Sequence, residues 1–133
     1  MTPEQHEMFE AALAAYGNAH APYSGFPVGA AVRSASGRVY SGCNVENAAY
    51  PQGWCAEASA IAAMVTAGER RIAAVLVVAG GTETITCCGG CRQKIREFAS
   101  ADVPVWSCDP AGLRAAFTLG ELLPHSFGRD NLA

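Results

Sequence analysis

Charged residues are few in this chain, and a long apolar run is lacking. Only 16% of the 133 residues are charged, and the formal net charge is −3. Without a basic excess there is no electrostatic reason to expect a nucleic acid or an anionic membrane as partner. No stretch of about 18 apolar residues is present, so the sequence predicts no transmembrane helix. Small neutral ligands remain open as partners.

The N-terminal segment lacks the apolar core of a signal peptide. Met1 to Glu10 carries acidic residues instead, so we expect a cytoplasmic protein. Six cysteines in such a chain indicate metal binding or catalysis rather than a disulfide framework. Half of the residues are hydrophobic, which is enough for a sizeable core, and the length predicts one domain over residues 1–133.

Three of the cysteines fall in two short motifs, Cys55-Ala56-Glu57 and Cys88-Gly89-Gly90-Cys91. Three thiolates can hold one Zn²⁺ ion and leave its fourth position open, as in catalytic zinc sites. Zinc lowers the pKa of its bound water towards neutrality, and a nearby carboxylate can move protons. The motifs therefore predict a hydrolase in which Cys55, Cys88 and Cys91 bind a zinc ion. The zinc carries the reactive hydroxide, and Glu57 is the proton shuttle.

Hydrophobic periodicity and turn residues predict alternating helices and strands. The first helix is capped by Thr2 with Gln5 in a capping box and ends near Gly17. Further helices are expected at 56–67, 89–100 and after Thr118, and strands at 28–33, 39–43, 72–79, 103–107 and 114–118. This alternation indicates a layered α/β domain around one sheet. Both cysteine motifs fall at helix starts, where backbone N–H groups and the helix dipole favour thiolates.

Two details of these elements carry structural expectations. The helix over 56–67 is apolar on nearly every side, so we expect it to be buried all round. Pro104 cannot donate a backbone hydrogen bond, so the strand around it should start late or lie at a sheet edge.

Five segments, in order along the chain, resemble the small homotetrameric cytidine deaminases. They are residues 21–31, 42–50, 55–57, 88–93 and 121–128. The resemblance implies a three-layer α-β-α sandwich around a five-stranded mixed sheet, with Zn²⁺ as cofactor. It also implies hydrolysis of cytidine and deoxycytidine to uridine and deoxyuridine in pyrimidine salvage. The partners it implies are the nucleoside substrate and three further copies of the chain, with shared active sites.

The resemblance also assigns roles to single positions. Cys55, Cys88 and Cys91 are similar to the zinc ligands, and Glu57 to the proton shuttle. The expected substrate-binding residues are Asn44 and Glu46 for the ribose hydroxyls, Phe26 for the pyrimidine, the Ala56 backbone for the base, and Tyr50 and Phe127 for a neighbouring subunit's site. Phe26, Tyr50 and Phe127 can also be read as packing residues, and the asparagine as a turn residue.

Two positions depart from the family pattern. Cys87 stands where proline is usual, so two adjacent thiols compete for one ligand position. The two-residue spacing to Cys91 favours Cys88, which leaves Cys87 as a spare and easily oxidised thiol. Ala58 stands where many members have arginine, which removes one counter-charge from the zinc thiolates. Arg92 and the two helix starts remain to compensate.

Other functions fit part of the pattern. A deaminase of the same fold could act on a modified cytosine nucleoside, with the loop at 51–54 reshaping the pocket. Cys88 and Cys91 alone could form a redox dithiol. A closed structural zinc module would need Cys87 or Cys43 as a fourth ligand and would have no use for Glu57.

Overall fold

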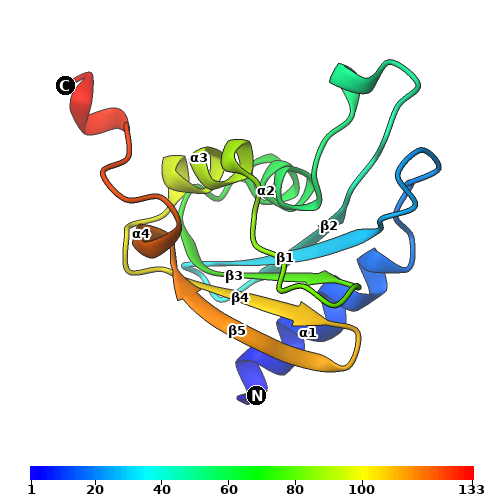
Figure 1. Cartoon of the computed structure of the whole chain (residues 1–133). Helices are drawn as coiled ribbons and strands as arrows, with labels where there is room; N and C mark the ends of the chain where they lie inside the picture. Colours follow the sequence, from blue (N-terminus) through cyan, green and yellow to red (C-terminus); the bar gives the residue numbers. More distant parts are fainter.

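A mixed five-stranded sheet forms the centre of the computed structural model, which describes residues 1–133 (Figure 1). Its strands lie in the order β2-β1-β3-β4-β5. Only β3 and β4 pair in parallel, and the other neighbours are antiparallel. The bounds are β1 Val28–Ser34, β2 Val39–Cys43, β3 Ile72–Ala79, β4 Pro104–Asp109 and β5 Gly112–Thr118. The predicted five-stranded mixed sheet is therefore confirmed.

Helices cover both faces of this sheet, as Figure 1 shows. Helix α1 (Pro3–Tyr16) packs on one face, and α2 (Ala56–Thr66) and α3 (Gly89–Phe98) pack on the other. The short α4 (Leu119–Leu122) follows β5, and single 3₁₀ turns occur at Tyr50–Gln52 and Arg129–Asn131. This is the predicted three-layer α-β-α sandwich. No helix in it combines the length and apolarity needed to cross a bilayer.

The central strand β3 explains why the sheet needs two helical layers. Val75 and Val77 belong to the apolar cluster on the side of α2 and α3. Leu76 and Val78 belong to the cluster on the side of α1. Because successive side chains of a strand point to opposite faces, a continuous apolar run is stable only when both faces are covered.

Local signals set the ends of the elements. The Thr2 hydroxyl accepts a hydrogen bond from the Gln5 N–H at 3.1 Å, and the Thr2 N–H donates to the Gln5 side chain at 2.9 Å. This is the predicted capping box of α1. A matching pair between Thr118 and Glu121 begins α4.

Two glycines allow the helices to approach the sheet closely. A Cβ at Gly29 would lie 2.0 Å from the Ala12 carbonyl oxygen of α1. A Cβ at Gly42 would lie 2.5 Å from the Ala60 nitrogen of α2. Helix α2 begins at the first cysteine motif, so Gly42 helps to set the position of that motif.

Several sequence-based expectations need correction. Helix α2 is not buried all round, because Ala62 and Ala63 face outwards and are exposed. For β4, one of the two predicted alternatives is confirmed: the strand starts late, at Pro104 instead of Val103, and a first residue tolerates a missing N–H. The other alternative is wrong, since β4 lies between β3 and β5 and not at an edge. Helices α2 and α3 end one or two residues earlier than predicted.

Candidate zinc and substrate site

Three thiols gather where the N-termini of α2 and α3 meet. Cys55 is the N-cap residue of α2, Cys88 is the N-cap residue of α3, and Cys91 lies in the first turn of α3. Their three sulfur atoms all lie within 4.8 Å of one another. The Sγ atoms of Cys55 and Cys88 are 3.6 Å apart. Both helices therefore direct their positive ends at the thiols, which favours thiolates.

This donor set fits a zinc ion. Tetrahedral zinc with Zn–S bonds of about 2.3 Å places its sulfur ligands roughly 3.8 Å apart, close to the observed separation. Neither Cys43 nor Cys87 belongs to the cluster, so the structure offers no fourth thiolate to close the site. Cys91 is buried whereas Cys88 is exposed, so the open side of the cluster faces away from the core.

Hydrogen bonding already separates the thiols by acidity. A hydrogen bond from the Cys91 thiol, with a second from Cys88, lowers the pKa of Cys55 to about 6. The same bond to Cys55, together with burial, raises the pKa of Cys91. One thiolate is therefore favoured near neutral pH before a metal binds, and zinc binding would displace the remaining protons.

Glu57 lies beside the thiols in an apolar setting. It is the second residue of α2 and is only 4% exposed, which is unusual for a carboxylate. It lines a cavity of about 180 Å³ whose other walls are Val28, Asn44, Cys55, Ala56, Ile85, Thr86 and Cys88. The carboxylate and two of the sulfur-bearing residues thus share one small cavity. A molecule held there can exchange protons with Glu57 while it contacts a metal ion.

Asn44 lines the same cavity and also holds the chain beside it. Its Oδ1 accepts from the Val28 N–H at 2.8 Å, and its Nδ2 donates to the Phe26 carbonyl oxygen at 3.0 Å. The amide therefore fixes the start of β1 next to the cavity. Asn44 therefore also has the turn-shaping role that was the alternative interpretation of this residue.

Glu46 lies in a separate, larger cavity. Its Oε1 accepts from the N–H groups of Tyr23 and Ser24 at 2.9 and 3.1 Å, and the Ser24 hydroxyl donates to Oε2. The Ser24 hydroxyl is the main cause that lowers the pKa of Glu46. This cavity, of about 370 Å³, is lined by Tyr23, Ser24, Glu46, Asn47, Tyr50 and Gly53.

The aromatic residues expected at the site lie outside the cavity of Glu57. Phe26 is 41% exposed and lines an adjoining hollow together with residues 80–85. Tyr50 is 75% exposed and packs edge-to-face with Tyr23, with ring centroids 5.8 Å apart. Phe127 is 59% exposed, and its carbonyl accepts from the Gln93 side chain at 2.9 Å. Neither Tyr50 nor Phe127 lines the cavity of Glu57, although Tyr50 lines the cavity of Glu46.

The residue before the second metal motif differs from the expectation. Cys87 is 1% exposed and belongs to the apolar core, and burial raises the pKa of its thiol. The prediction of an easily oxidised thiol is therefore wrong, because oxidation needs an accessible thiolate. Arg92 donates to the carbonyls of Cys87 and Leu122 and to the Thr86 hydroxyl at 2.6–2.7 Å. It thereby ties this loop to α4.

Sequence reasoning missed three residues of the cavity wall, Val28, Ile85 and Thr86. Val28 and Ile85 carry no reactive or polar side chain, so only their positions in the sequence could have indicated a role in the cavity wall. Val28 starts the strand that Asn44 holds, and Ile85 and Thr86 directly precede the second cysteine motif.

Comparison with known proteins points in one direction. The family described as "Cytidine and deoxycytidylate deaminase zinc-binding region" matches residues 2–107. A cytidine deaminase of Sporosarcina psychrophila is 41% identical over 115 residues, covering 86% of this chain and 85% of that protein. One from Halalkalibacterium halodurans is 35% identical over 129 residues, with 97% and 98% covered.

Solved structures agree with these sequence matches. The cytidine deaminase of Burkholderia pseudomallei superposes with a TM-score of 0.86 at 41% identity, covering 96% of this chain and all of that one. The cytidine deaminase of Mycobacterium tuberculosis gives a TM-score of 0.79 at 36% identity, with 93% and 97% covered.

Proposed function

The chain belongs to the cytidine and deoxycytidylate deaminase family and is a zinc-dependent cytidine deaminase, and from this premise we propose how its residues divide the reaction. The reaction joins cytidine and water to give uridine and ammonia, and deoxycytidine reacts in the same way. One observation carries the proposal: a buried carboxylate, Glu57, shares a small cavity with Cys55 and Cys88, two members of the thiol cluster that Cys91 completes.

The three thiolates hold the zinc ion at the N-termini of α2 and α3. When bound there, zinc lowers the pKa of a water molecule towards neutrality and so supplies the nucleophile for the C4 carbon of cytosine. Three thiolates give the centre a net negative charge. The two helix starts offset part of this charge, and Arg92, tied to the adjacent loop, offsets more in the absence of an arginine at Ala58.

Glu57 moves the protons. It first takes a proton from the attacking water and delivers it to the ring nitrogen beside C4, which makes this carbon more electrophilic. After the oxygen has added to C4, Glu57 takes the remaining hydroxyl proton and transfers it to the exocyclic amino group. The C4–N bond then breaks, ammonia leaves, and C4 keeps the oxygen as a carbonyl. The same group must accept and donate in turn, which a carboxylate can do and an amide cannot. Its burial, at 4% exposure, shields these transfers from bulk solvent.

The nucleoside is bound by groups around the cavity. Ala56 is the first residue of α2, so its N–H has no partner within the helix and can donate to the base. Phe26 contacts the pyrimidine from the adjoining hollow. Asn44 and Glu46 bind the ribose hydroxyls. Both side chains are already held by backbone groups, which fixes them before substrate arrives and lowers the entropic cost of binding.

The active form is a homotetramer in which subunits share sites. Tyr50 and Phe127 are strongly exposed and lie outside the Glu57 cavity of their own subunit, so each can reach the Glu57 cavity of a neighbour. The whole chain, residues 1–133, acts as one deaminase domain. We place the enzyme in the cytoplasm, where it serves pyrimidine salvage.

Deamination by the zinc-loaded protein tests this function. The deamination of cytidine and of deoxycytidine is measured as the loss of cytosine absorbance, with Glu57→Ala as the inactive control. We expect rapid loss with the wild type only. Folded, zinc-loaded protein that leaves both nucleosides unchanged would contradict the proposal, and a panel of modified cytosine nucleosides would then identify the substrate. Reversible oxidation of Cys88 and Cys91 without bound zinc would instead indicate a redox protein.

A further inference from the structure

One wall of the substrate cavity belongs to a segment without regular secondary structure. Residues 80–86 connect β3 to the second cysteine motif, and Ile85 and Thr86 line the cavity beside Glu57. Ile85 also lines the hollow that contains Phe26. A segment of this kind has no ladder of backbone hydrogen bonds, so side chains from elsewhere must satisfy its carbonyls if it is to hold one conformation.

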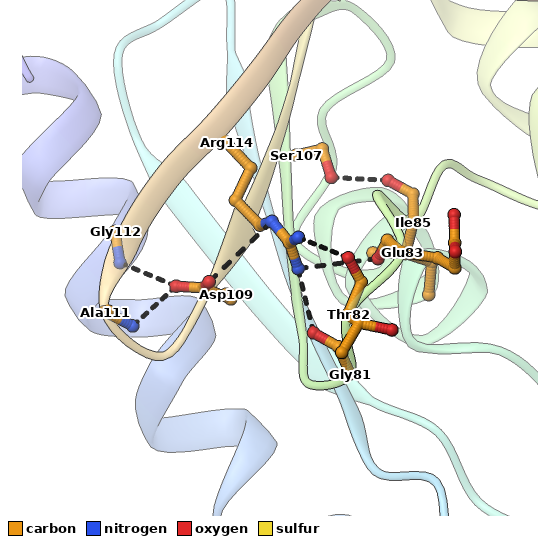
Figure 2. A network of polar contacts seen from close by, with 9 residues as sticks. All are labelled: Gly81, Thr82, Glu83, Ile85, Ser107, Asp109, Ala111, Gly112 and Arg114. Atoms are coloured by element: carbon orange, nitrogen blue, oxygen red, sulfur yellow. Dashed lines mark hydrogen bonds and ion pairs between the residues drawn. The ribbon is translucent and has the colours of Figure 1, made fainter.

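Arg114, on the edge strand β5, provides most of these contacts. Its Nη1 donates to the Gly81 carbonyl at 2.9 Å and its Nη2 to the Thr82 carbonyl at 2.7 Å, as Figure 2 shows. The Glu83 carbonyl lies 3.5 Å from Nη1, at the limit of a hydrogen bond. One planar guanidinium therefore joins consecutive carbonyls, which a single point charge cannot do equally well.

Arg114 is itself held by the turn between β4 and β5. Its Nε lies 3.7 Å from Oδ2 of Asp109. The other oxygen of Asp109 accepts from the N–H groups of Ala111 and Gly112 at 2.7 and 3.1 Å (Figure 2). Asp109 thus orders the turn with one oxygen and faces the guanidinium with the other.

Ser107 of β4 continues this set of contacts towards the cavity. Its buried hydroxyl donates to the Ile85 carbonyl. The Ile85 backbone is therefore tied to the sheet while the same residue forms part of the cavity wall. Arg114, Ser107 and Asp109 all come from β4 or β5, and none of them lines the cavity of Glu57.

We propose that Arg114 and Ser107 are positioning residues for nucleoside binding: they hold segment 81–85 so that Ile85 forms a fixed wall of the substrate cavity. This inference rests on the proposed function, because the cavity of Glu57 is taken as the site of the cytosine ring. Neither residue contacts the reacting atoms. They act by ordering the wall before substrate arrives, so that binding does not have to order it.

The expected effect is therefore on substrate binding and not on proton transfer. Without the guanidinium, the segment is released and must be ordered each time a nucleoside binds. KM for cytidine should rise about tenfold in Arg114→Ala, as expected when one or two hydrogen bonds are lost. Because Glu57 and the thiols stay in place, kcat should change less than about twofold and bound zinc should stay at the wild-type level.

The test compares zinc-loaded wild type with Arg114→Ala, Arg114→Lys, Ser107→Ala and Arg38→Ala. Arg38 is an exposed arginine just before β2 and serves as the matched control. The measurements are kcat, KM, zinc content, thermal stability and amide hydrogen exchange of residues 81–86. We expect faster exchange and higher KM in Arg114→Ala, an intermediate KM in Arg114→Lys, and wild-type values in Arg38→Ala. Ser107→Ala should raise KM in the same direction.

Each contrary result has a distinct meaning. Unchanged KM and unchanged exchange of residues 81–86 in Arg114→Ala would overturn the proposal. Loss of zinc or an equal fall in kcat across the Arg114 and Ser107 variants would overturn it too, since it would place the effect on the metal site. If the wild type itself leaves cytidine unchanged, the proposed function fails, and the exchange data alone still decide whether Arg114 orders the segment.

Discussion

Glu57 is the residue on which the chemistry depends most. Glu57→Gln keeps the shape of the side chain but can no longer accept and donate a proton in turn. We predict that this variant retains zinc and the fold, while kcat falls by about 10²–10⁴-fold or more, the range of general acid–base contributions. Zinc content is measured together with single-turnover deamination of cytidine.

The matched control for this substitution is Glu10→Gln, at an exposed glutamate on α1, which should leave kcat unchanged. Turnover near the wild-type level in Glu57→Gln would remove this residue from the proton-transfer role. Loss of zinc in the same variant would instead mean that the carboxylate stabilises the metal site.

Ser24 controls the ionisation of Glu46. Its hydroxyl is the main cause of the lowered pKa of this carboxylate, whose ordinary value is 4.5. Because the pKa of Glu46 is lowered in the folded state, its hydrogen bonds to residues 23–24 stabilise the fold fully at a pH above the ordinary pKa. This stabilisation is lost as the pH falls through the lowered pKa. We predict that Ser24→Ala raises the pKa of Glu46 towards 4.5, so the stabilisation is lost at a higher pH.

A pH titration of the Glu46 side-chain carboxyl by NMR checks this prediction. Ser41→Ala, at an exposed serine of β2, is the control and should leave the titration unchanged. An unaltered titration in Ser24→Ala would show that the backbone N–H groups of Tyr23 and Ser24 are enough to hold the carboxylate ionised.

At the residue scale, the sequence predicts which side chains carry the chemistry better than it predicts the surroundings of each side chain. The thiol cluster can be predicted because cysteine spacing and the neighbouring carboxylate are local features of two motifs. The burial of Cys87 and the wall position of Ile85 could not be predicted in this way. Both depend on how residues 80–88 pack against β4, β5 and α2, which lie far away in the chain.

At the scale of elements, the distance between α2 and the sheet depends on Gly42. A methyl group there meets the backbone of Ala60 at 2.5 Å, so α2 must move away and take Cys55 and Glu57 with it. We predict that Gly42→Ala costs about 3 kcal/mol in the free energy of unfolding, the upper range for overpacking, and weakens zinc binding. Urea unfolding and zinc content measure the two effects.

Gly29 and Gly17 provide the comparison. Gly29→Ala should destabilise as strongly, because its Cβ meets the backbone of α1, but should leave zinc binding less affected since α1 lies on the opposite face. Gly17→Ala has its nearest contact at 3.5 Å and should change stability by less than about 0.5 kcal/mol. Equal stability of all three variants would show that the helices can shift freely on the sheet.

The elements themselves were largely predictable, because each carries a periodicity and a capping or turn signal of its own. The capping boxes at Thr2 and Thr118 are examples. The exposed side of α2 was not predictable, since alanine suits both a core and a surface. The place of β4 inside the sheet was also hidden, because Pro104 permits a strand start or an edge and only the pairing with β3 and β5 decides.

At the scale of the whole molecule, the exposed aromatic residues distinguish a lone subunit from an assembly. Tyr23, Tyr50, Trp54 and Phe127 are exposed although they are large and apolar. Aromatic side chains of this kind are enriched at protein interfaces. The proposed tetramer would bury them and bring Phe127 to a neighbouring subunit, so that one site draws residues from two chains.

Mixing two impaired variants tests such sharing directly. Glu57→Gln subunits lack the proton shuttle but keep Phe127, whereas Phe127→Ala subunits lack the aromatic but keep Glu57. In co-expressed tetramers mixed at random, about a quarter of the sites should receive both intact residues, and activity should exceed the sum of the separate variants. Light scattering confirms that the mixed sample is tetrameric.

The control pairs Glu57→Gln with Cys55→Ala. Both changes lie on the same chain's part of the site, at the start of α2. A site with Cys55 from one subunit and Glu57 from another cannot form, so no mixture of these variants is expected to gain activity. If the Phe127→Ala mixture also gains nothing, or if a stable monomer is fully active, each subunit carries a complete site and Phe127 only anchors the C-terminal segment.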